Sequence, residues 1–190
     1  MKFKQYLERN LNPVQKQVEK ELEITLGEIE IRDKKHFLDD ILETDPEIEP
    51  SEKESMKKRL LDRNRGKLDF AGGFHRIFPN RIYYDSNCIT FPGYEDAIYF
   101  RHLAHELSHA SHYNIVGKDD YKSVSSGFAE GFATYLSEKL IKDKFGIDLP
   151  GETSERLLLR EEFKYDLKKS KVDSPDKLKN FLKNNFNFSE

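Results

Sequence analysis

Hydrophobic and polar residues repeat with two different periods along this chain. Apolar residues three or four positions apart predict helices, as at Val14, Val18 and Leu22, whereas the alternation at residues 27–32 predicts a half-buried strand. On this basis, helices are predicted at 13–23, 33–43, 52–64, 95–113, 121–143, 152–169 and 175–186. Strands are predicted at 27–32, 74–78, 81–85 and 87–91. This mixture of helices and strands indicates an α+β fold.

Residues that favour caps and turns mark several ends of these segments. Pro13 suits the first turn of the first helix, and Ser51 with Glu54 forms a capping box before the third. Gly146 follows the helix at 121–143 and is expected to close it.

The composition excludes several classes of protein. A length of 190 residues suits one domain, and 36% hydrophobic with 35% charged residues is a water-soluble composition. The net charge of −3 provides no general attraction to nucleic acid or anionic membranes, and no apolar run approaches the roughly 20 residues of a membrane span. The single cysteine excludes an internal disulfide, and residues 1–10 lack the apolar core of a signal peptide. We therefore expect a cytoplasmic protein with neither nucleic-acid nor membrane partners.

The predicted helix at 95–113 contains an H-E-x-x-H motif, in which His105 and His109 flank Glu106. Residues four apart on a helix lie one above the other, so both imidazoles can reach one ion. Glu106 lies about a quarter-turn round from His105, close enough to touch a metal-bound water. The motif therefore predicts a zinc site in which Glu106 is the general base.

The histidines of this helix share one face. A helical wheel of about 100° per residue groups His102, His105, His109 and His112. The opposite face carries the apolar and small residues Phe100, Leu103, Ala104, Leu107, Ala110 and Ser111. We expect the second face to pack into the core and the histidine face to line the site. Four of the six histidines lie on this stripe, which disfavours the alternative of a surface helix with chance histidines.

A buried helix downstream carries one acidic residue in its interior. Apolar residues recur there every four positions, at Val124, Phe128, Phe132, Leu136 and Leu140, and Glu130 and Gly131 interrupt them. A buried carboxylate is costly unless it is paired or bound to metal, so Glu130 is either a zinc ligand or the partner of an arginine or lysine. Zinc needs a third protein ligand, which favours the first reading. Gly131 is expected to let the metal-binding helix approach closely.

These two motifs, in this order, resemble those of the gluzincin metallopeptidases. The segment Glu-Gly-Phe-Ala-Thr-Tyr at 130–135 is similar to one in the alanyl-aminopeptidase-type enzymes, and the small size resembles the minigluzincins. The resemblance covers about residues 74–140. Here 20 residues, 110–129, separate the second histidine from the glutamate, where the aminopeptidases have 18, and Ala129 replaces an asparagine. Their Gly-x-Met-Glu-Asn segment is absent, so aminopeptidase specificity is not implied.

The resemblance implies a zincin-like fold with two lobes in one compact catalytic domain. The N-terminal lobe, residues 1–113, would hold a small mixed β-sheet and the metal-binding helix. The helical C-terminal lobe, residues 114–190, would supply the third ligand. An edge strand, either 81–85 or 88–91, would pair with an extended substrate.

The resemblance also implies a zinc metallopeptidase acting on peptides or proteins. One Zn²⁺ ion would be held by His105, His109 and Glu130. Gluzincins usually stabilise the oxyanion with a tyrosine or histidine from further downstream, and Tyr165 is the candidate here, although helix packing also accounts for it. His75 is a second candidate for that role.

Two other functions remain open on the sequence. The chain could be a non-catalytic zinc-binding or regulatory module on a zincin fold, but Glu106 disfavours this because a purely structural zinc site does not need it. It could instead be a regulatory protease of narrow specificity. The substrate and the oligomeric state are not determined by these motifs.

Overall fold

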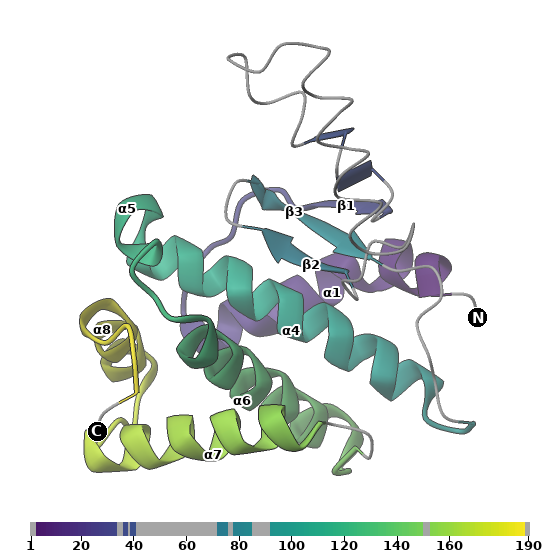
Figure 1. Cartoon of the computed structure of the whole chain (residues 1–190). Coiled ribbons are helices and arrows are strands. Elements are labelled where there is room, and N and C mark those ends of the chain that lie inside the picture. Colours follow the sequence, from purple (N-terminus) through teal and green to yellow (C-terminus); the bar gives the residue numbers. More distant parts are fainter. Residues whose placement is uncertain are drawn as a thin grey trace.

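The structure, a computed structural model, describes residues 3–33, 36–37, 39–40, 72–75, 78–84, 92–149 and 153–188 (Figure 1). Its helices are α1 Phe3–Leu22, α4 Glu95–Val116, α5 Lys118–Tyr121, α6 Ser126–Phe145, α7 Ser154–Lys169 and α8 Pro175–Asn184. Its strands are β1 Glu30–Asp33, β2 Gly72–His75 and β3 Phe78–Tyr84. The predicted α+β class is confirmed. The predicted helix at 52–64, the strand at 87–91 and most of the helix at 33–43 lie outside the described residues.

Helix α1 begins ten residues earlier than predicted, so Pro13 lies inside the helix and not in its first turn. Proline in a helix interior costs about 3 kcal/mol through a lost hydrogen bond and a steric clash. The apolar stripe nevertheless continues to the start of the helix, and six of its side chains are buried: Phe3, Tyr6, Leu7, Val14, Val18 and Leu22. Burial of each such side chain stabilises by about 1.5–3 kcal/mol, which outweighs the cost of the proline.

The three described strands form a mixed sheet in the order β1-β3-β2. Strand β1 pairs in parallel with β3, where Ile31 lies opposite Ile82, and β2 pairs antiparallel with the other side of β3. The prediction that residues 81–85 form a substrate-binding edge strand is therefore wrong, since β3 is paired on both sides. The alternative edge strand, 88–91, lies outside the described residues.

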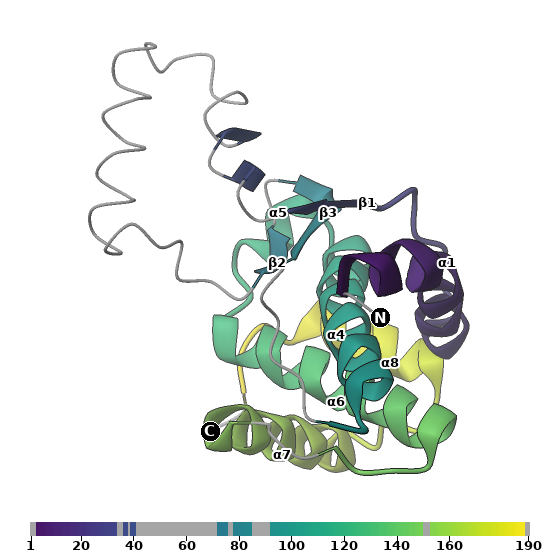
Figure 2. The ribbon, with the colours of Figure 1, turned by 90° about the vertical axis from the view of Figure 1, so that its right-hand side faces the viewer.

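Helix α4 is at the centre of the molecule. Figures 1 and 2 show the sheet on one side of α4 and helices α6 and α7 on the other. Small residues let these neighbours approach. Ser108 and Ser111 are fully buried, and their hydroxyls are satisfied because they donate to the carbonyls of Ala104 and Leu107. Among the described helices, none combines the length and the apolar character that crossing a bilayer requires.

Local caps fix both ends of α6. Ser125 accepts a hydrogen bond from the Phe128 backbone N–H at 3.2 Å, as an N-cap does. The predicted start at residue 121 was too early, because α5 and a turn precede this cap. Gly146 ends the helix in the left-handed conformation, as predicted, with φ of 67°.

Gly131 on α6 allows close packing of α7, and not of α4 as predicted. A Cβ at this position would lie 2.6 Å from the Leu159 carbonyl oxygen and 2.9 Å from the Phe188 ring. The Leu159 backbone belongs to α7. The glycine therefore seats α7 directly on α6, beside Glu130.

We expect Gly131→Ala to destabilise the protein by about 1–3 kcal/mol, as overpacking does, although alanine is the better helix former by about 1 kcal/mol. Gly127→Ala is the matched control, because its Cβ would meet only the flexible end of Leu159, at 3.3 Å, and the Phe188 ring at 3.7 Å. The Gly127 variant should therefore be as stable as the unaltered chain or more so. Urea unfolding compares the two, and equal stability of both variants would contradict the tight α6–α7 contact.

Candidate metal centre

Two adjacent helices bring the three predicted ligands together. His105 and His109 extend from α4, and Glu130 extends from α6. The Nε2 atoms of the histidines lie 3.2 Å apart. Glu130 Oε2 lies 3.3 Å from His105 Nε2, and Oε1 lies 3.3 Å from His109 Nε2. Within the described residues, this is the group of histidine, cysteine and acidic side chains that could hold a metal ion.

These separations fit a single ion. Nitrogen and oxygen ligands about 2.0–2.1 Å from a tetrahedral zinc stand about 3.3–3.4 Å from one another. The observed separations of 3.2 and 3.3 Å are close to that spacing. Glu130 Oε2 is also buried and makes no hydrogen bond among the described residues, despite its short distance to His105. The two distances to Glu130 involve its two different oxygens, and one ligand atom from each of the three residues lies within 4.8 Å of the others. Two imidazoles with one carboxylate are a donor set of catalytic zinc sites.

The protonation states also suit metal binding. Burial lowers the pKa of His105 to about 3, so its imidazole is neutral at physiological pH. Burial alone would raise the pKa of Glu130, but the neighbouring His105 and His109 outweigh burial and hold that pKa below its usual range. A neutral imidazole and an ionised carboxylate are the forms that bind metal.

The histidine face of α4 is less open than predicted, because α6 covers much of it. His105 and His109 are buried and His102 is half-buried. His112 is fully buried, and neither of its ring nitrogens makes a hydrogen bond among the described residues. Its ring packs instead among aromatic rings, with centroid distances of 5.2 Å to Tyr121, 6.0 Å to Phe128 and 5.2 Å to Phe132. His112 is therefore a core residue and not part of the metal site.

Acid should destabilise the metal-free protein through His112. Burial lowers the pKa of His112 to about 3, whereas histidine in an unfolded chain has a pKa of about 6.5. Between these values the unfolded chain binds a proton that the folded chain does not, so stability falls as pH falls, by about 1.4 kcal/mol per pH unit for this group. His112→Phe should remove that share of the slope in urea unfolding between about pH 6 and 4.5. Parallel stability curves for the variant and the unaltered chain would contradict this assignment.

Arg156 on α7 is the residue of this region that the sequence did not single out. Its Nε lies 3.4 Å from Glu130 Oε2, and both side chains are about one-third exposed, at 36% and 34%. Glu130 therefore lies beside an arginine, which was the alternative reading of this residue from the sequence. It also lies at ligand-like distances from both histidines. One sequence signal could have identified Arg156. A cation in the first turn of a helix is unfavourable because it opposes the helix dipole, so its presence there indicates a compensating partner.

The two predicted catalytic residues, Glu106 and Tyr165, differ in their position relative to the candidate ligands. Glu106 directly follows His105 on α4 and is half-buried, as a residue beside the site should be. Tyr165 is 63% exposed on α7, where Lys169 Nζ lies 6.0 Å from its ring centroid. It lies nine residues beyond Arg156 along that helix, which corresponds to about 13 Å. The structure therefore does not bring Tyr165 to the candidate ligands. The side chain of His75 lies outside the description.

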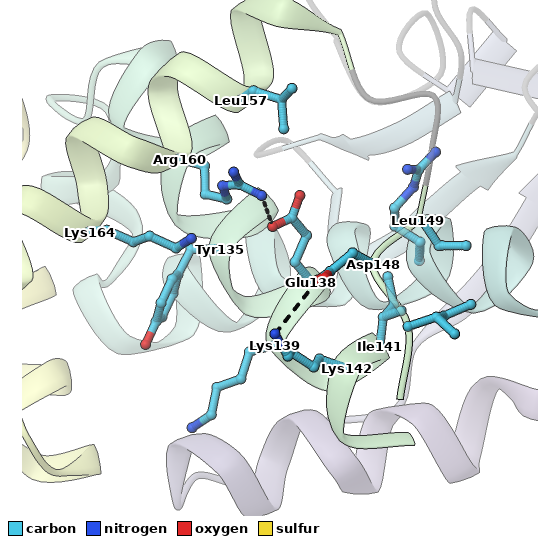
Figure 3. Close-up of a pocket in the computed structure, with 12 residues that line it drawn as sticks. Tyr135, Glu138, Lys139, Ile141, Lys142, Asp148, Leu149, Leu157, Arg160 and Lys164 are labelled. Atoms are coloured by element: carbon cyan, nitrogen blue, oxygen red, sulfur yellow. Dashed lines mark hydrogen bonds and ion pairs between the residues drawn. The ribbon is translucent and has the colours of Figure 1, made fainter. Parts of the chain in front are cut away.

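A separate hollow of about 590 Å³ lies between α6 and α7, near the start of α4 (Figure 3). Arg160 and Glu138 form an ion pair across it, and Lys142 pairs with Asp148 at 3.8 Å. None of the three candidate ligands lines this hollow. It is therefore distinct from the candidate metal centre. Two of its other cations pair with residues outside its lining, Lys139 with Glu21 and Lys164 with Glu161.

Comparisons with known protein families, with curated proteins and with solved structures found no match for this chain. The geometry of the described residues and the motifs in the sequence therefore carry the functional assignment.

Proposed function

We propose that this protein is a zinc-dependent metallopeptidase of the gluzincin type. The observation that carries the proposal is the convergence of His105, His109 and Glu130 from two helices at separations that fit one zinc ion. The small mixed sheet followed by α4 and α6 agrees with the zincin-like fold that the motifs imply. No step of the proposal depends on the hollow between α6 and α7.

Each residue of the centre has a role in peptide hydrolysis. His105, His109 and Glu130 would hold the zinc, which lowers the pKa of a bound water and polarises the scissile carbonyl. Glu106 would accept the proton of the attacking water and pass it to the leaving amine, as a general base and then a general acid does. Burial keeps the His105 imidazole neutral, and the burial of both imidazoles excludes bulk water from the ligand side of the centre.

Metal removal tests this proposal. The purified chain should contain about one zinc ion per molecule, consistent with a single three-ligand site. Cleavage of a mixed peptide library should be lost with a chelator and restored by zinc. Cleavage that survives full metal removal would refute the proposal. Zinc binding without cleavage of any peptide would also refute it, and would support the non-catalytic zinc module instead.

A further inference from the structure

We infer that Arg156 is a positioning residue for the third metal ligand, an inference that rests on the proposed zinc site. The guanidinium approaches the Glu130 carboxylate from α7, whereas the two imidazoles approach it from α4. Carboxylates that bind metals are usually held by a second group, which fixes their orientation and tunes their affinity. Arg156 is placed to be that group.

Its placement on α7 is well fixed. Thr153 caps α7 by accepting a hydrogen bond from the Arg156 backbone N–H at 3.3 Å, so the backbone of Arg156 itself is held by the cap. Three residues further on, the Leu159 carbonyl lies against Gly131, the residue next to Glu130. The absence of a side chain at Gly131 therefore lets the α7 backbone lie close to α6 beside Glu130.

The location of this arginine is unfavourable for the helix alone. Arg156 is the third residue of α7, where the exposed N–H groups give the helix end a partial positive charge. A cation there costs about 0.3–1 kcal/mol relative to a neutral residue. Glu130 supplies the compensating negative charge. A residue that breaks a local rule is typical of a site where function fixes the geometry.

The charges of the centre agree with this role. Two neutral imidazoles and one carboxylate would leave a zinc-loaded centre with a net charge of about +1. Arg156 therefore acts on the orientation of Glu130 and not by neutralising the ion. Its Nε faces Oε2, and the other oxygen, Oε1, faces His109. In this arrangement Glu130 is restrained in an orientation that presents both of its oxygens to the histidines.

The test is zinc affinity, measured without substrate by competition with a chelating dye. Arg156→Gln should weaken zinc binding about 10–100-fold, the usual loss when such a supporting group is removed, and Arg156→Lys should recover part of it. The matched control is Arg160→Gln. Arg160 lies one turn further along α7 and pairs with Glu138 of α6, so it joins the same two helices away from the metal ligands. Its replacement should leave zinc affinity unchanged.

Each outcome decides one question. Equal affinity of Arg156→Gln and the unaltered chain would overturn the inference. An equal loss in both glutamine variants would also overturn it, because loosening of α7 would then be the cause. If the unaltered chain binds no zinc, the proposed function itself fails. If Arg156→Gln weakens zinc binding but the unaltered chain cleaves no peptide, the inference stands and the peptidase assignment fails.

Discussion

Replacing Glu130 by alanine should weaken zinc binding on the order of a hundredfold or more and abolish peptide cleavage. Four-ligand zinc sites bind the ion with a free energy of about 10–16 kcal/mol, so each ligand contributes roughly 3 kcal/mol. Among the described residues three candidate ligands come together, and Glu130 is the one contributed by α6. Without it, zinc would retain two imidazoles from a single helix. Zinc affinity by dye competition and cleavage by the library assay measure the two effects.

The controls for this variant are two exposed acids near the site in sequence. Asp119 and Asp120 lie in the short helix α5 between α4 and α6. Asp119→Ala and Asp120→Ala should leave both zinc binding and cleavage intact. If either control lost zinc as Glu130→Ala does, or if Glu130→Ala kept its zinc, the ligand set would have to be reassigned.

Replacing Glu106 by glutamine should lower kcat about 10²–10⁴-fold, which is the usual contribution of a general base. Glutamine has nearly the same shape as glutamate but cannot accept the proton of the attacking water. Because Glu106 is not among the converging ligands, zinc affinity and folding should not change. Steady-state kinetics on a peptide that the unaltered chain cleaves, combined with zinc titration, separates the two properties.

The Glu106 variant also separates catalysis from metal binding. A loss of zinc from Glu106→Gln would show that the residue supports the ligands and not the water. Unchanged turnover would show that another group is the base. Either result would leave the assignment of the three candidate ligands unchanged and would remove the proposed mechanism.

The three candidate ligands could be predicted from the sequence because their positions follow from local geometry. His105 and His109 are four residues apart on a helix, which fixes their mutual distance without knowledge of the fold. Glu130 was identifiable because a carboxylate inside an apolar helix requires a partner. The elements that carry these three residues, α4 and α6, were predicted for the same reason, from strong apolar periodicity.

The features that sequence did not predict depend on contacts between distant segments. The start of α1 at Phe3 depends on burial against α4, which outweighs the local preference of Pro13. The contact of Gly131 with α7, and the approach of Arg156 to Glu130, depend on how α7 packs on α6. The pairing of β3 with β1 depends likewise on a strand distant in sequence. Periodicity within a segment shows that one face is buried, but not which element covers it.

The most direct test of the central claim is a crystal structure of the zinc-loaded protein with diffraction recorded at the zinc absorption edge. One anomalous peak is expected, at roughly 2.0–2.2 Å from the Nε2 atoms of His105 and His109 and from a carboxylate oxygen of Glu130. Arg156 should remain beside the same carboxylate. A zinc peak elsewhere, or a Glu130 side chain turned away from the histidines into an ion pair with Arg156 alone, would contradict the gluzincin assignment.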